Sequence, residues 1–250
     1  MDALWSEAGF AARLLLLALL TVALGAWFGT GLRFLPLWAL ARAAVQLSVV
    51  ALVLRGVLAA PWTVVAFVVL MLSTASWTSM DRLRGLWHGR AAALVGVLAG
   101  ALLSLAAIFS LGLVALEARY VVAIGGIVIG NAMSAATLSG RNFLRAAQSG
   151  IAEIEAWFAL GAIPAVAHRS IGREATRESL IPTLDQSKST GLVTLPGAFV
   201  GALFGGAGPA DAARFQLVVL AGIALAMTIT SMVVTTLVGR SPHIYDAHRD

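Results

Sequence analysis

Apolar runs about as long as a membrane is thick constrain this chain more than any other feature. They lie near residues 11–29, 39–58, 62–80, 91–115, 120–139, 189–206 and 214–238. A helix needs about 20 residues to cross a hydrocarbon core of about 30 Å, and it satisfies its backbone hydrogen bonds without water. We therefore expect an all-α polytopic membrane protein with about seven transmembrane helices, organised as a single domain over residues 1–250.

The composition agrees with this fold class and excludes several kinds of chemistry. Hydrophobic residues make up 60% of the chain and charged residues only 12%, whereas soluble domains carry roughly twice that charge. We read the net charge of +5 as arginines in cytoplasmic loops and not as a nucleic-acid surface. The absence of cysteine excludes disulfides, thiolate metal sites and cysteine nucleophiles.

The basic residues predict an orientation in the membrane. With the N-terminus outside, thirteen of the 17 Lys and Arg residues fall in inner segments and four in outer ones. Short cytoplasmic loops carry such an excess. We therefore expect a multi-pass protein of the cell inner (plasma) membrane with the N-terminus outside and the C-terminus in the cytoplasm.

One long polar segment, Glu153 to Pro182, interrupts the apolar runs. At its start, apolar residues recur every three to four positions, which indicates a helix with one apolar face; they are Ile151, Ile154, Trp157 and Phe158. Charged residues follow over positions 168–178. Such a helix either lies on the lipid surface or docks into a groove on a soluble partner.

Two runs carry polar side chains that would lie within the membrane. Gln46 lies in the second run, where it either bonds to another helix or lines a translocation path. The cytoplasmic half of the fifth run is the most polar membrane stretch, and it also either joins helices or lines a path. Its candidate path residues are Asn131, Met133, Ser134 and Thr137.

The sixth run contains Leu195-Pro196-Gly197, which must kink or break a helix because proline cannot continue its hydrogen bonds. Pro196 and Gly197 are therefore further candidate path residues, with a kink needed only for packing as the alternative. Glycines at 197, 201 and 205 predict a close helix contact. Single pairs such as Gly96 and Gly100 carry less weight, because they arise by chance in a chain so rich in glycine.

The motifs of several enzyme classes are missing. No Gly-x-x-x-x-Gly-Lys-Ser/Thr loop exists, since Ser187 stands where the Ser187-Lys188-Ser189 run would need glycine, so the chain is not a P-loop ATPase. No His-Glu-x-x-His occurs, and no Asp or Glu lies within a predicted run apart from its ends. The four histidines fall in predicted cytoplasmic segments, and His243 and His248 read as a solvated tail. We therefore expect a chain that is not an enzyme of these classes.

Spacing within the polar segment resembles a known element. Glu155-Ala156, then Gly161, then Ile171 reproduces Glu-Ala-(four)-Gly-(nine)-Ile. This pattern resembles the cytoplasmic loop of ATP-binding-cassette (ABC) permeases that fits into the ATPase subunit. The resemblance implies an ATPase-coupling segment at about residues 141–186, with coupling residues Glu153, Glu155, Ala156, Trp157, Gly161 and Ile171.

Further stretches are similar, in order and spacing, to the FetB-like permease family, which includes the bacterial iron-export permease and the plant aluminium-tolerance permeases. They are Ala43 to Leu47, Leu52 to Arg55, Gly130 to Ala135, Ala159 to Ala162 and, longest, Leu180 to Gly197. The resemblance implies a permease subunit that pairs with itself as a homodimer and with two copies of a separate ATPase. ATP and Mg would be bound by that ATPase, with no cofactor in this chain.

The same resemblance implies export linked to metal homeostasis, with iron as the best-known bacterial case. The positions after Gly197 depart from the family's methionines and polar residues, since they read Ala198, Phe199, Val200 and Ala202. This removes candidate metal ligands, and no metal-binding residue is assigned. Export of a non-metal solute such as a nucleotide sugar, and an ATP-independent channel or scaffold, remain alternatives.

Overall fold

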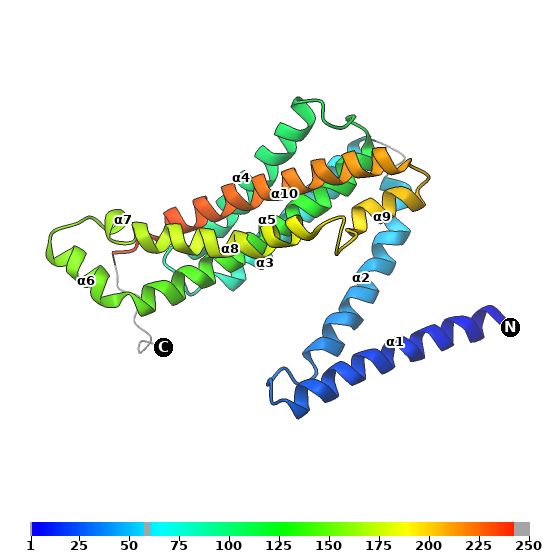
Figure 1. The fold of residues 1–250 in the computed structure, drawn as a ribbon, viewed down its shortest axis with the longest axis horizontal. Helices are drawn as coiled ribbons and strands as arrows, with labels where there is room; N and C mark the ends of the chain where they lie inside the picture. Colours follow the sequence, from blue (N-terminus) through cyan, green and yellow to red (C-terminus); the bar gives the residue numbers. More distant parts are fainter. Residues whose placement is uncertain (1, 58–60, 243–250) are drawn as a thin grey trace. The chain divides into compact units, whose positions relative to one another are not determined.

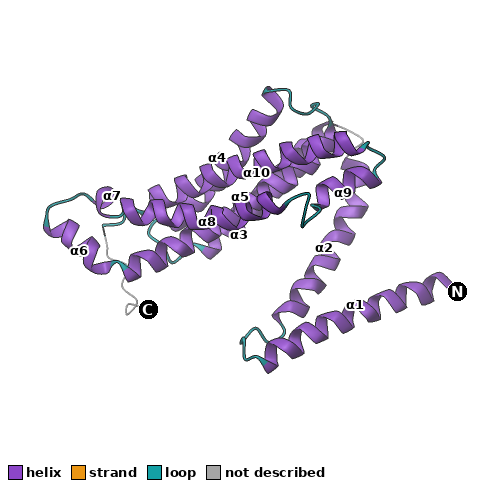
Figure 2. Ribbon diagram, in the orientation of Figure 1, coloured by secondary structure: helices purple, strands orange, loops and turns teal. Residues whose placement is uncertain are grey.

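The computed structural model describes residues 2–57 and 61–242, and regular structure in these residues is helical (Figures 1 and 2). The chain divides into two compact units, Met1–Ala60 and Pro61–Asp250. The first unit contains α1 (Asp2–Trp27) and α2 (Leu35–Val57), which pack on each other. The second contains α3 (Pro61–Arg82), α4 (Gly89–Ser110), α5 (Ala118–Ser149), α6 (Ile151–Ala159), α7 (Pro164–Ala167), α8 (Arg169–Ser189), α9 (Gly197–Phe204) and α10 (Pro209–Val238).

Six described helices are long and apolar enough to cross a membrane: α1, α2, α3, α4, α5 and α10. They correspond to six of the seven predicted runs, so the all-α polytopic membrane fold is confirmed. The remaining run, 189–206, is not a continuous helix. Helix α8 ends at Ser189 and α9 begins at Gly197, so the predicted break at Leu195-Pro196-Gly197 is confirmed and is complete.

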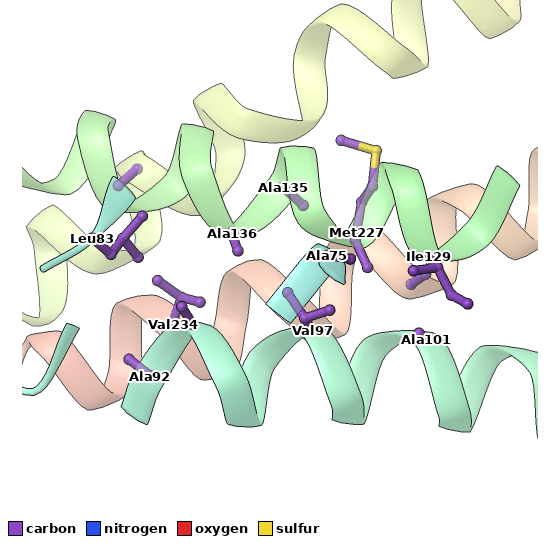
Figure 3. Close-up of a cluster of buried hydrophobic side chains, with 14 of the residues drawn as sticks. Ala75, Leu83, Ala92, Val97, Ala101, Ile129, Ala135, Ala136, Met227 and Val234 are labelled. Carbon is purple, nitrogen blue, oxygen red and sulfur yellow. The ribbon is translucent and has the colours of Figure 1, made fainter. Parts of the chain in front are cut away.

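The core of the second unit lies between α3, α4, α5 and α10. Figure 3 shows buried side chains from these four helices meeting in one cluster, among them Val97, Ile129 and Met227. Many of the others are alanines that are fully buried. Small side chains let helix backbones approach closely, which is how helices associate where lipid removes the hydrophobic driving force.

The closest helix contact is the seam between α4 and α10. A Cβ atom added to Gly100 would meet Thr230 Oγ1 and lie 2.5 Å from the carbonyl oxygen of Ala226, and one added to Gly96 would lie 2.8 Å from Val234 Cγ2. Thr230 Oγ1 donates a hydrogen bond to the Gly96 carbonyl at 3.0 Å. Gly96 and Gly100, which the sequence alone marks less strongly than the glycine triple, therefore lie at a close contact between two helices.

The glycine triple behaves differently. Added Cβ atoms at Gly197 and Gly201 would meet nothing within 4 Å, and one at Gly205 would meet only the backbone of its own helix. The prediction that this triple marks a close contact is wrong within this chain. Helix α9 has no buried residue, so no neighbouring backbone approaches the triple.

Helices α8 and α9 run antiparallel to α10 along most of its length (Figure 1). The Thr176 and Thr235 hydroxyls are 3.0 Å apart, and the Ser179 and Ser231 hydroxyls are 2.9 Å apart. At the far end, the Phe199 N–H donates to Gln216 Oε1 at 3.1 Å. Gln216 and Thr235 are 19 residues apart in α10, or about 28 Å along the axis, which is close to the thickness of a hydrocarbon core.

The predicted coupling segment, 141–186, is therefore not one amphipathic element. Its first nine residues continue α5, which reaches Ser149, and its last part is most of α8. Between them, α6 and α7 form a hairpin at one end of the second unit (Figure 1). The part of the segment that projects from the bundle is short.

Candidate functional site

The hairpin owes its shape to the glycine of the Glu-Ala-Gly-Ile pattern. Gly161 has a φ of +78°, a conformation that residues with a Cβ atom rarely adopt. Its N–H donates to the Phe158 carbonyl at 2.9 Å, and the Ala162 N–H donates to the Trp157 carbonyl at 3.0 Å. These two bonds form a Schellman motif that ends α6. Gly161 therefore turns the chain back towards α8.

Helix α6 presents its predicted coupling residues to the outside. Glu153, Glu155 and Ala156 are exposed, and Trp157 is 40% exposed, whereas Ile154 is fully buried. Tryptophan is enriched at protein contact surfaces. The structure thus leaves these four residues accessible to a partner.

Ile171 requires a correction. It was predicted as a coupling residue, but it is only 5% exposed. A Cβ atom added to Gly150, at the junction of α5 and α6, would lie 3.7 Å from Ile171 Cδ1. Ile171 therefore packs at the base of the hairpin, where it borders the groove between α5, α6 and α8, and it does not lie on the exposed face of α6.

Two further contacts hold α6 to the bundle. Ser170 Oγ, in the first turn of α8, donates to Glu153 Oε1 at 3.0 Å. The buried His168 ring stacks on Phe143 of α5 at 5.9 Å and meets the edge of Phe158 of α6 at 6.0 Å. These contacts connect α6 to α5 and to the start of α8.

An open groove of about 620 Å³ lies between α5, α6 and α8. Three carboxylates line it, those of Glu153, Glu174 and Glu178, together with one guanidinium, that of Arg145. The groove begins beside the exposed face of α6. A partner that docks on α6 would meet this mainly acidic surface.

Arginines gather at the same end of the second unit. Helices α3, α5 and α10 end there, and α4 and α8 begin there. Among the residues of this unit that the structure describes, two arginines lie at the opposite end, Arg119 and Arg214. The nine at the α6 end are Arg82, Arg84, Arg90, Arg141, Arg145, Arg169, Arg173, Arg177 and Arg240.

The neighbours of α8 define which part of it lies at membrane depth. Helix α10 has no charged residue between Arg214 and Arg240, and α5 has none from Tyr120 to Gly140, about 32 Å of helix. The two stretches lie side by side, since the ring centroids of Tyr120 and Phe215 are 5.8 Å apart. The hydrocarbon core must fall within these uncharged stretches, because charged residues there are costly.

Charged residues of α8 lie at that depth. Ser179 lies beside Ser231 of α10. Thr190, eleven residues after Ser179, borders the same pocket as Leu220, eleven residues before Ser231. The stretches 179–190 and 220–231 therefore span the same depth. Asp185 and Lys188 lie between these levels, opposite the middle of α10. Lys188 Nζ donates to Asp185 Oδ1 at 2.9 Å, and the side chains are 78% and 59% exposed, respectively.

Sequence reasoning missed this pair because it placed Asp185 in the cytoplasmic segment and counted Lys188 among the inner-loop charges. A usable signal was present. Hydroxyl residues recur at positions 176, 179, 183, 187 and 190, three to four apart, which indicates one helix face that continues past Pro182. That face contacts α10 at Thr176 and Ser179.

The break after Ser189 is held in a defined conformation. Gly191 has a φ of +92°, and its N–H donates to the Thr194 carbonyl at 2.8 Å. Pro196 and Gly197, both predicted path residues, start α9. The side-chain oxygen of Gln216, a buried residue of α10, accepts a hydrogen bond from the Phe199 N–H. This bond satisfies one of the free donors at the start of α9.

The other candidate path residues are not all brought to one place. On α5, the Asn131 amide, the Ser134 hydroxyl and the Thr137 hydroxyl each donate to the backbone of their own helix. Met133 is half-buried and packs against the core. Gln46 is exposed on α2, in the first unit, and its predicted role stays a prediction.

Similarity to known proteins indicates the family of this chain. Residues 9–242 match the uncharacterised protein family UPF0014. The chain belongs to this family. A cyanobacterial UPF0014 membrane protein, slr1647 of Synechocystis, is 34% identical over 247 residues, which cover 94% of this chain and 92% of that protein. No solved structure gave a significant match.

Two UPF0014 relatives carry more informative names. The UPF0014 membrane protein STAR2 of rice is 32% identical over 210 residues, 83% of this chain and 73% of that protein. The probable iron export permease protein FetB of Escherichia coli is 31% identical over 186 residues, 73% of this chain and 71% of that protein. The resemblance to the FetB-like permease family is thereby confirmed.

Proposed function

We propose that this UPF0014 chain is the transmembrane permease subunit of an ABC transporter, driven through α6 by a separate ATPase subunit. The exposed helix α6 is the observation that carries the proposal. It projects from the bundle, ends at a turn that needs glycine, and displays Glu155, Ala156 and Trp157 on its accessible face.

The mechanism follows from how the hairpin is attached. ATP, with Mg, binds to two ATPase copies and closes them. Helix α6 moves with the ATPase and passes the motion to α5 and α8 through His168 and the bond from Ser170 to Glu153. Helices α8 and α9 and the turn between them, together called the α8–α9 crossing, then shift against α10. This shift opens the path to one side of the membrane or the other.

Several further features belong to the proposal. Two copies of the chain form the transporter as a homodimer. The gathering of arginines at the α6 end supports a cytoplasmic location for that end, with the N-terminus outside and the protein in the inner membrane. The probable iron export permease among the relatives supports export linked to iron homeostasis.

The proposal is tested by co-purification of the chain with candidate ABC ATPase subunits co-expressed with it. We expect Glu155→Lys and Gly161→Val to abolish association, because the first reverses a charge on the docking face and the second removes the turn. Glu117→Lys is the matched control, since Glu117 lies at the opposite end of the second unit. Normal association of both α6 variants would contradict the docking assignment and favour an ATP-independent channel.

A further inference from the structure

The pair Asp185–Lys188 is the feature of the fold that is hardest to reconcile with a lipid environment. Both side chains are mostly exposed, yet they lie opposite the uncharged middle of α10 and α5. Ionic groups at that depth face protein or water and not lipid. Something other than acyl chains must therefore meet this face of α8.

The backbone beside the pair leads to the same conclusion. The turn from Thr190 to Pro196 is irregular, and among the described residues no hydrogen bond reaches the carbonyls of Gly191, Leu192 and Val193. Unpaired backbone groups at membrane depth are tolerated where they line a water-filled cavity or are buried in protein. Discontinuous helices of this kind surround solute sites near the membrane midplane in many transporters.

We propose that Asp185 and Lys188 form a water-accessible ionic site halfway through the membrane, on the route of the transported solute, and that this site takes a positively charged group. The inference rests on the proposed function, because it assigns residues to the route of the transported solute. Its test uses the chain without the ATPase, so the two can fail separately.

The sign of the charge follows from the atoms around the pair. Asp185 and the three free carbonyls present oxygen acceptors, whereas Lys188 is the one cation on this part of α8. Lys188 holds the carboxylate at 2.9 Å when no solute is present. A cationic group replaces the Lys188 ammonium at Asp185, and Lys188 moves aside on its flexible stem.

The absence of native cysteine allows a direct test, since one introduced cysteine is the sole thiol of the chain. Gln186→Cys places that thiol at the exposed position next to Asp185 in α8. Leu225→Cys is the control: Leu225 is exposed on the uncharged part of α10, opposite Asp185 in depth. Each variant is reconstituted in phosphatidylcholine vesicles and treated with two membrane-impermeant methanethiosulfonates, one carrying a trimethylammonium group and one a sulfonate.

We expect Gln186→Cys to react at least about tenfold faster than Leu225→Cys with the cationic reagent, because thiolates form and react in water and not in lipid. The cationic reagent should react faster than the anionic one at Gln186→Cys. Adding Asp185→Asn should reverse that preference, and adding Lys188→Gln should enlarge it. Circular dichroism confirms that each variant is folded.

Two results would overturn the proposal. Equal, slow labelling of Gln186→Cys and Leu225→Cys would mean that this face of α8 meets lipid or a dry protein interface. Fast labelling whose charge preference ignores Asp185→Asn would mean that water reaches the site but the carboxylate does not select the solute.

Discussion

Helix α10 and the α8–α9 crossing lie side by side over the same depth, yet they differ in continuity, charge and packing. Helix α10 is continuous, uncharged between Arg214 and Arg240, and locked to α4 by glycines and hydroxyls. The α8–α9 crossing is interrupted, carries an ion pair and contributes no buried residue from α9. The contrast separates a scaffold, which must not move, from an element that can shift against it.

The largest expected effect lies at the scaffold. Gly100→Leu would force a side chain against the Ala226 carbonyl and Thr230. We expect a loss of about 3 kcal/mol of stability, because a clash with backbone cannot be relieved by a rotamer change. Gly201→Leu is the matched control in α9, where an added Cβ atom meets nothing. It should change stability by less than about 0.5 kcal/mol.

Thermal unfolding in detergent, followed by circular dichroism, measures both variants. Similar losses for Gly100→Leu and Gly201→Leu would remove the distinction between the two crossings. In that case α9 would be as tightly packed as the seam between α4 and α10.

A medium effect is expected at the hydrogen bond between the start of α9 and Gln216 of α10. Gln216→Leu leaves the partly buried Phe199 N–H without its acceptor, at a cost of about 1 kcal/mol. Amide hydrogen exchange across residues 197–204 should speed up about tenfold, while exchange in α10 should stay the same. Faster exchange throughout α10 would show that Gln216 supports the scaffold itself.

The smallest effect is expected where the hydroxyls of α8 meet α10. Ser179→Ala removes the 2.9 Å contact with Ser231, and membrane hydrogen bonds of this kind contribute about 0.6 kcal/mol. A double-mutant cycle with Ser231→Ala should give a coupling energy of that size. A coupling energy near zero would mean that packing alone positions α8.

The sequence was sufficient for the fold class, since runs of about 20 apolar residues leave few alternatives to membrane helices. It also located the break at Pro196 and the exposed helix at Glu155. It did not predict the place of α8, because that helix is too polar to resemble a span. Its neighbours α5 and α10 bring it to membrane depth, and no local pattern contains that information.

Two smaller errors share a cause. Gly96 and Gly100 were given less weight than the triple at 197, 201 and 205, although the pair alone meets a neighbouring helix. The Glu-Ala-Gly-Ile spacing makes Ile171 a coupling residue like Glu155, although its side chain is mostly buried at the base of the hairpin and not displayed on α6. Spacing shows which residues share a face; it does not show what covers that face.

The central claim is that α6 passes the state of the ATPase to the α8–α9 crossing. The direct test is the labelling rate of Gln186→Cys in vesicles that also hold the ATPase, with and without ATP. We predict a change of about tenfold on addition of ATP, and no change when Glu155→Lys is also present. A rate that responds to ATP equally in both proteins, or in neither, would contradict the account.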